Sequence, residues 1–208
     1  MISITLVIII LTCIVSFTAM NNNKIISDLI FYPPAITEQN QWYRFFTCAL
    51  IHGDIMHLVF NMWGLYIFCE NLEAAFTYIF PTLGRFLYVA LYLFAQFFCL
   101  VPTYVKNKDN RMYQSLGASG AVSGIVFASI VLFPTSKLGL LFIPIGIPGF
   151  IFGILYLVAS YYMAKRGRDN INHEAHIFGA LAGVAFTIIS CYLFSGFDPV
   201  KNFVTQIT

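Results

Sequence analysis

The sequence predicts an all-α membrane protein: a bundle of six transmembrane helices with a structured first loop. Two observations carry this prediction. Of the 208 residues, 59% are hydrophobic and only 10% are charged, a composition far outside that of soluble proteins. Apolar runs long enough to cross a hydrocarbon core of roughly 30 Å recur along the chain. We expect one membrane domain over residues 1–208 and no separate soluble domain.

The first expected span, residues 2–20, has no basic leader and no clear cleavage site, so we interpret it as a transmembrane helix and not as a signal peptide. The connector at 21–47 contains two adjacent prolines and the aromatic cluster QWYRFF. Aromatic rings settle at the membrane interface, so this connector is predicted to be a structured interfacial segment. The second span, residues 49–69, begins with two histidines.

The third and fourth spans, residues 86–103 and 115–133, are long enough to cross the membrane. The fifth, 149–164, is short and follows the sequence LFIPIGIPGF. Prolines and glycines in that sequence disfavour a continuous helix and predict an irregular or mobile lead-in. The sixth span covers 175–194.

Charge and cysteine usage exclude several classes of function. The net charge of +2 is small and the basic residues are scattered, so no nucleic-acid partner is expected. The five cysteines lie mostly in apolar segments without C-x-x-C spacing, so neither a disulfide framework nor a zinc site is predicted. The sequence leaves the oligomeric state open.

Basic residues divide unevenly between alternate connectors. Taken alone, the positive-inside rule places the first, third and fifth connectors in the cytoplasm. These connectors hold Lys24, Arg44, Lys106, Lys108, Arg111, Lys165, Arg166 and Arg168, and the others hold Arg85, Lys137 and Lys201.

Several polar side chains interrupt the apolar spans. Such residues are costly in lipid and usually face the protein interior or a water-filled cavity. In the second span His57 and Asn61 are four residues apart and share a helix face, whereas His52 lies about 140° from His57 on a continuous helix. His57 and Asn61 are therefore expected to point at one target.

Two ridges of small residues predict a close contact between the fourth and sixth spans. Small residues at every fourth position let membrane helices approach backbone to backbone. The ridges are Gly120, Gly124 and Ala128 in the fourth span and Gly179 and Gly183 in the sixth.

Ser119 and His176 lie at the starts of these ridges, so facing ridges would bring them to similar depth. A serine hydroxyl is a weak nucleophile until a positioned base takes its proton, and neutral imidazole is the usual base. Suitable oxyanion donors are the Ser119 backbone N–H, His57 and Asn61. No intramembrane acid completes a triad, so we predict a Ser119–His176 dyad and assign Ser123 to packing.

Alone, each of these residues also has an ordinary structural interpretation. Serines in membrane helices are common packing residues, glycine ridges usually serve packing only, and a histidine at a helix end is often interfacial. The joint occurrence of serine, two histidines and asparagine near one membrane surface favours catalysis.

Together these motifs resemble those of the rhomboid intramembrane serine proteases over residues 31–194. The family's G-x-S-G element is matched by GASG, with Ser119 at the nucleophile, and its A-H-x2-G-x3-G element by AHIFGALAG, with His176 at the base. Its H-x4-H-x3-N element is matched by HGDIMHLVFNM. Its W-R motif is similar to YRFFTCALIH, in which Arg44 matches and tyrosine replaces the tryptophan. Glu73 falls where the family often has a glutamate.

The resemblance implies a bacterial-type rhomboid core of six helices that hydrolyses peptide bonds in or beside substrate transmembrane helices through an acyl-enzyme. No cofactor and no metal are expected, and the implied partners are transmembrane protein substrates and the lipid bilayer. The fifth helix and its cap would admit substrate. The implied oxyanion donors are His57, Asn61 and the Ser119 backbone N–H, and the implied supporting residues are His52, Gly117, Gly120 and Arg44.

The resemblance also implies a place in the membrane. We expect a multi-pass protein of the bacterial cytoplasmic membrane whose active site opens to the extracytoplasmic side. That orientation is opposite to the one favoured by the basic residues.

One departure from the family lies beside the nucleophile. Many members carry an aromatic residue four positions after it, whose ring packs against the base, and here that position is Ser123. We therefore expect another group to orient His176.

Three alternatives remain. A catalytically inactive rhomboid-like protein would bind membrane clients on the same fold, although such relatives typically lack the nucleophile or the base. A metal or haem protein would use His52, His57, His173 and His176, but the sequence HEAH has the wrong spacing for the H-E-x-x-H zinc motif. A transporter would favour internal repeats, and we find none.

Overall fold

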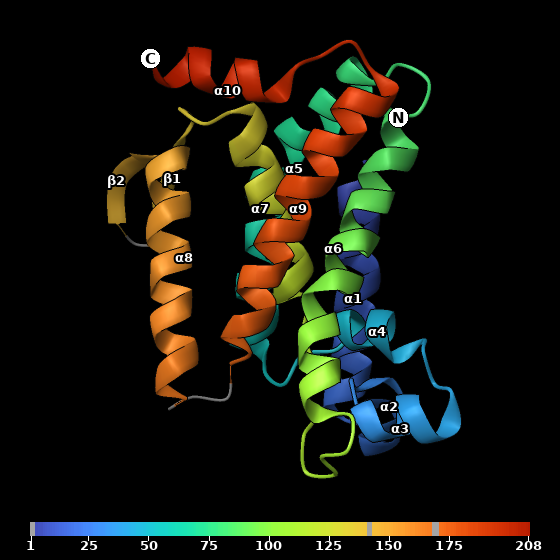
Figure 1. Cartoon of the computed structure of the whole chain (residues 1–208). Coiled ribbons are helices and arrows are strands. Elements are labelled where there is room, and N and C mark those ends of the chain that lie inside the picture. The colour runs from blue at the N-terminus through green and yellow to red at the C-terminus, as the bar shows by residue number, and fades with distance from the viewer. Residues whose placement is uncertain (1–2, 141–142, 168–170) are drawn as a thin grey trace.

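The computed structural model describes residues 3–140, 143–167 and 171–208. It is mostly helical, and its long helices pack as a bundle (Figure 1). The elements are α1 (Ile4–Met20), α2 (Asn23–Leu29), α3 (Pro33–Gln39), α4 (Arg44–Thr47), the 3-10 turn Cys48–Leu50, α5 (Ile55–Ile79), α6 (Gly84–Asn107), α7 (Ser119–Leu132), β1 (Lys137–Leu140), β2 (Ile143–Pro148), α8 (Gly149–Arg166), α9 (His173–Phe194) and α10 (Pro199–Ile207).

Several of these helices are suited to a membrane. Among the described residues, α6 and α9 are long and apolar enough to cross it, and Arg44–Leu50 with Ile55–Cys69, bent by 100°, is a third candidate span. The apolar helices α1 and α7 are shorter, with 17 and 14 residues. The chain is therefore an integral membrane protein, while length and composition identify at most three spans among the described residues, where six were expected.

The second expected span is wrong at both ends. Helix α5 begins at Ile55, because the Asp54 side chain caps it by accepting a hydrogen bond from the His57 N–H at 2.8 Å, and it continues to Ile79. His52 precedes the helix, so the helical angle expected between His52 and His57 does not apply. Their rings instead meet edge to face, with centroids 4.8 Å apart.

Other boundaries also differ from the expectation. Helix α7 begins at Ser119 and not at position 115, and α10 was not expected at all. The prediction of an irregular lead-in to the fifth span is wrong for Ile143–Pro148. This segment pairs with Lys137–Leu140 as an antiparallel hairpin. Three expectations fall partly outside the described residues: the start of the first span at position 2, the beginning of the lead-in at 141–142, and the basic residue at 168. The first connector forms α2, α3 and α4, which confirms that it is structured.

Helix α7 forms the centre of the bundle. All its residues after Ser119 are buried, and α5, α6 and α9 pack against it. A Cβ atom at Gly179 would overlap the backbone of Gly120, and one at Gly183 would overlap that of Gly124. The prediction that the two small-residue ridges face each other is confirmed.

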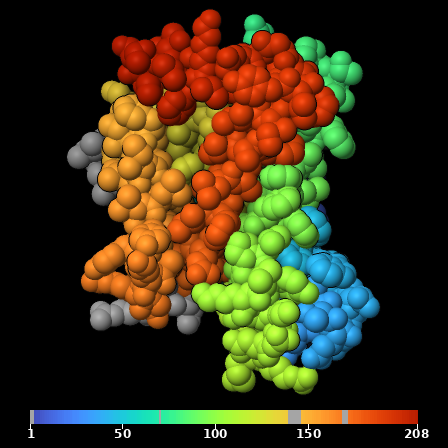
Figure 2. All heavy atoms as spheres, viewed as in Figure 1, coloured from blue at the N-terminus to red at the C-terminus, as the bar shows by residue number. Residues whose placement is uncertain are grey.

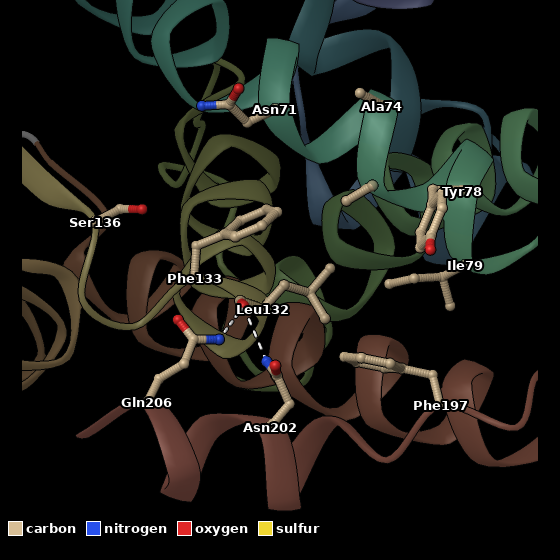
Figure 3. A pocket seen from close by; sticks show the side chains of 11 residues that line it. Asn71, Ala74, Tyr78, Ile79, Leu132, Phe133, Ser136, Phe197, Asn202 and Gln206 are labelled. Atoms are coloured by element: carbon tan, nitrogen blue, oxygen red, sulfur yellow. Dashed lines mark hydrogen bonds between the residues drawn. The ribbon is translucent and has the colours of Figure 1, made fainter. Parts of the chain in front are cut away.

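Helices α8 and α10 lie at the periphery of the bundle (Figure 1). Helix α8 stands at one edge with the hairpin on its outer side, and in the space-filling view atoms of α7 are visible between α8 and α9 (Figures 1 and 2). Helix α10 lies across one end of the bundle (Figure 1). There Asn202 and Gln206 each donate a hydrogen bond of 3.0 Å to the carbonyl oxygen of Leu132, which caps the C-terminus of α7 (Figure 3).

Candidate active site

The side chains of Ser119 and His176 meet where α7 and α9 begin. Ser119 is the first residue of α7 and His176 lies in the first turn of α9. Ser119 Oγ and His176 Nε2 are 2.8 Å apart, within hydrogen-bonding distance. The glycine contacts between the two helices allow this approach, because a larger residue at Gly179 would force them apart.

The start of α9 is anchored by Asn172. Its Oδ1 accepts from the Ala175 N–H at 3.0 Å, and its Nδ2 donates to Thr103 Oγ1 at 3.0 Å and to Tyr113 Oη at 3.1 Å. Burial raises the pKa of the Tyr113 phenol, so its hydroxyl stays neutral. Asn172 therefore ties the turn that carries His176 to α6. Sequence analysis missed it, although asparagine just before a helix is an N-cap signal.

The loop before Ser119 requires glycine at position 117. Gly117 has φ = +111°, a conformation that residues with a Cβ rarely adopt. A Cβ there would lie only 2.6 Å from His57 Cε1 and 2.7 Å from His57 Nε2. The His57 ring therefore packs directly against the loop, two residues before Ser119.

His52 supports the same loop and is 1% exposed. Its Nε2 accepts from the Ala118 N–H at 3.4 Å, and its Nδ1 lies 3.0 Å from Ser16 Oγ. Because the Ser16 hydroxyl donates to the Leu50 carbonyl oxygen at 2.8 Å, Nδ1 carries the imidazole proton and donates it to Ser16. His52 thus links the loop to α1.

Asn61 lies one helical turn beyond His57. Its Nδ2 donates to the His57 carbonyl oxygen at 2.9 Å, which occupies one of the two amide hydrogens. The second hydrogen is the one that could serve a substrate oxygen.

Arg44 lies in a different network. It is 6% exposed and donates to the carbonyl oxygens of Ser27 and Ile30 at 2.8 and 2.7 Å. These bonds hold α4 to the end of α2. The first connector reaches the site region elsewhere, through paired backbone hydrogen bonds between Phe31 and Ser115.

Ser123 is buried, as expected of a packing residue, and its hydroxyl also makes two hydrogen-bonding contacts. Its hydroxyl donates to the Ser119 carbonyl oxygen at 2.8 Å and lies 2.6 Å from the Tyr156 hydroxyl. The Tyr156 ring in turn lies nearly parallel to the His176 ring, at 29° with centroids 6.3 Å apart. Sequence analysis missed Tyr156, because α8 also carries Tyr161 and Tyr162 and the sequence alone does not show which tyrosine faces α7.

A cavity of about 530 Å³ lies at the opposite end of the bundle, between α5, α7 and α10 (Figure 3). Among the described residues that line it, Ser136 is the only serine, and none is a histidine, aspartate or glutamate. The described residues also contain no group of three or more side chains that could hold a metal ion.

Comparison with known proteins identifies the family of the chain. The family model described as Rhomboid domain matches residues 39–193. "RHOMBOID-like protein 12, mitochondrial" of Arabidopsis thaliana is 34% identical over 156 residues, which are 69% of this chain and 45% of that protein. "Putative rhomboid protease YdcA" of Bacillus subtilis is 27% identical over 151 residues, 72% of this chain and 67% of the relative.

A third relative is "Presenilin-associated rhomboid-like protein A, mitochondrial" of Danio rerio, 31% identical over 138 residues, 64% of this chain and 33% of that protein. The chain thus spans less than half the length of the plant and fish relatives. Because both of these are named as mitochondrial, they do not support the expected assignment to the bacterial cytoplasmic membrane.

Proposed function

Since the chain belongs to the rhomboid family, we propose that it is an intramembrane serine endopeptidase that cuts peptide bonds in or beside the transmembrane helices of its substrates. The observation that carries the proposal is the 2.8 Å distance between Ser119 Oγ and His176 Nε2. These residues belong to two helices of an apolar bundle. The proposal treats the chain as one membrane domain with six spanning helices.

Acyl transfer needs only these two side chains for its proton movements. Ser119 Oγ attacks the scissile carbonyl carbon while His176 Nε2 takes the hydroxyl proton, and His176 then returns it to the leaving amine. The product is an ester on Ser119. Water, deprotonated by His176, hydrolyses that ester and restores the free hydroxyl.

The negative charge of the tetrahedral intermediate falls at the N-terminus of α7. As the first residue of the helix, Ser119 has a backbone N–H with no intrahelical acceptor, and the helix dipole favours negative charge there. His57, packed against Gly117, and the second amide hydrogen of Asn61 are the proposed side-chain donors. None of these donors requires a metal.

The test is cleavage of a model transmembrane substrate by the purified protein in liposomes. Ser119→Ala and His176→Ala are each expected to reduce cleavage below detection while leaving the unfolding temperature unchanged. Ser129→Ala is the matched control, because Ser129 is a buried serine deeper in the same helix, and it should cleave at the wild-type rate. Undiminished cleavage by Ser119→Ala would falsify the dyad.

A serine-reactive fluorophosphonate supplies a second readout that needs no substrate. We expect labelling of the wild-type protein and of Ser129→Ala, and none of Ser119→Ala. A folded wild-type protein that binds a transmembrane client without cutting it, and without labelling, would instead identify the client-binding alternative.

We further propose that the site end of the bundle faces away from the cytoplasm. Asp109 is exposed in the connector just before α7, so Asp109→Cys in a cysteine-free background can be labelled by a membrane-impermeant maleimide. Labelling of intact cells is expected. Labelling only after lysis would contradict this orientation and agree with the distribution of basic residues.

A further inference from the structure

An aromatic ring from α8 covers the candidate base. Tyr156 and His176 lie nearly parallel, at an interplanar angle of 29° and a centroid distance of 6.3 Å, an offset arrangement. The His173 ring meets His176 at 84°, with centroids 5.6 Å apart. The imidazole is therefore bordered by one ring from another helix and one from its own.

Hydrogen bonds hold Tyr156 to the turn that carries the nucleophile. The Ser123 hydroxyl has one hydrogen, and the 2.8 Å contact with the Ser119 carbonyl oxygen uses it. In the 2.6 Å contact between the two hydroxyls, Tyr156 must then be the donor and Ser123 the acceptor. The phenol is thus bound to Ser123, one helical turn after Ser119 in α7.

Apolar contacts restrict the same ring further. Its centroid lies 5.7 Å from that of Phe127 on α7 and 6.0 Å from that of Phe152 on α8. A ring packed on two sides and bound at its hydroxyl has little rotational freedom. It is therefore able to restrict a neighbouring imidazole.

We propose that Tyr156 is the positioning residue of His176, supplied by α8 and anchored by Ser123. The inference rests on the proposed serine protease function. Tyr156 does not take part in proton transfer; it holds the imidazole plane so that Nε2 stays directed at Ser119 Oγ. Ser123 fills the place from which an aromatic side chain could have reached the base, and binds an aromatic side chain of another helix instead.

This arrangement couples the position of α8 to the alignment of the dyad. Moving α8 away from α7 breaks the bond between Tyr156 and Ser123 and uncovers His176 in the same step. This support of the base by Tyr156 is therefore present only while α8 is packed against the bundle.

The test compares Tyr156→Leu with Tyr156→Phe in the liposome assay. Displacing a catalytic group by about 1 Å can cost roughly 100-fold in rate. We expect Tyr156→Leu to lower kcat about 10- to 100-fold with KM changed less than about twofold, and to slow fluorophosphonate labelling of Ser119 by a similar factor. Tyr156→Phe keeps the ring and should stay within about fivefold of wild type.

Tyr161→Leu is the matched control, because Tyr161 lies on the same helix with its side chain exposed beside Lys165. It should retain wild-type kcat. Labelling rates are normalised to the folded fraction, so that a purely structural effect of Tyr156→Leu cancels.

The outcomes separate the two proposals. Wild-type kcat in Tyr156→Leu, with Ser119→Ala inactive, overturns the positioning role and leaves the protease function intact. A loss of activity in Tyr156→Leu that is fully explained by a smaller folded fraction also overturns the positioning role. A wild-type protein that neither cleaves nor labels at Ser119 removes the protease function and this inference with it.

Discussion

Gly179 of α9 lies directly against the backbone carbonyl of Gly120 in α7, so closely that no Cβ atom fits between them. Gly120 is the residue after Ser119, and Gly179 lies one turn after His176. The contact that packs the two helices is therefore also the contact that sets the distance between the candidate nucleophile and base.

Gly179→Ala should consequently damage stability and activity together. The added methyl group would meet backbone and not a movable side chain, so the helices must separate. We expect a loss of about 1–3 kcal/mol in the free energy of unfolding and at least a tenfold loss of cleavage per folded molecule. Thermal unfolding in detergent and the liposome assay measure the two effects. Gly196→Ala, where nothing lies within 4 Å of the new Cβ, should change neither.

Gly117→Ala should affect catalysis through the loop. Alanine disfavours φ = +111°, and its Cβ would overlap the His57 ring. We expect roughly a 100-fold loss of kcat, because the loop leads directly into Ser119. Gly53→Ala is the control, since its Cβ would make an ordinary 3.8 Å contact with Leu116. Equal kcat for the two variants would show that the loop conformation is not required.

Substitutions of His57, in the first turn of α5, and of His52, just before that helix, should have different effects. His57→Ala is expected to lower kcat about 100-fold at unchanged KM and unfolding temperature, as for the loss of an oxyanion donor. His52→Ala leaves the Ala118 N–H without its acceptor and Ser16 without its donor, which should cost about 1–3 kcal/mol of stability. A stable His52→Ala protein, or a destabilised His57→Ala protein, would reverse these roles.

Glu73 should contribute to the stability of the fold and not to the cleavage reaction. Its carboxylate accepts from the N–H groups of Ile4 and Thr5 and from the hydroxyls of Ser3 and Thr5, at 2.8–3.1 Å. It thereby caps the N-terminus of α1, where negative charge is favourable.

Glu73→Ala is therefore expected to lower the free energy of unfolding by about 1–3 kcal/mol, as measured by chemical denaturation in detergent. Cleavage per folded molecule should not change. In Glu38→Ala only the exposed ion pair with Arg111 is lost, so its stability should fall by less than about 1 kcal/mol. Equal losses of stability in Glu73→Ala and Glu38→Ala would show that Glu73 does not stabilise α1 as a cap.

Part of the site could be predicted because its signals are local. The ridges at Gly120 and Gly179 follow from spacing along a helix, and spacing also places Ser119 and His176 at the starts of those ridges. The prediction that His52 lies within the second helix is wrong, and the reason is equally local. An apolar run does not show where a helix starts, and the cap by Asp54 places that start at Ile55.

Tyr156 could not be predicted in the same way. Which tyrosine of α8 faces α7 depends on the rotation of α8 about its axis, and in lipid both faces of a helix are apolar, so hydrophobic periodicity does not identify the inner one. The same limit applies to the hydrogen bond between Tyr156 and Ser123, whose residues lie 33 positions apart.

The sequence by itself determined the membrane environment, the helical composition and the pair of ridges that let two helices touch, because hydrophobicity and residue size act over a few neighbouring positions. Only the tertiary structure decided which side chains surround that contact: the His57 ring against Gly117, the His52 link to α1 and the Tyr156 ring over His176. These depend on how whole helices rotate and pack in three dimensions, which no local pattern encodes.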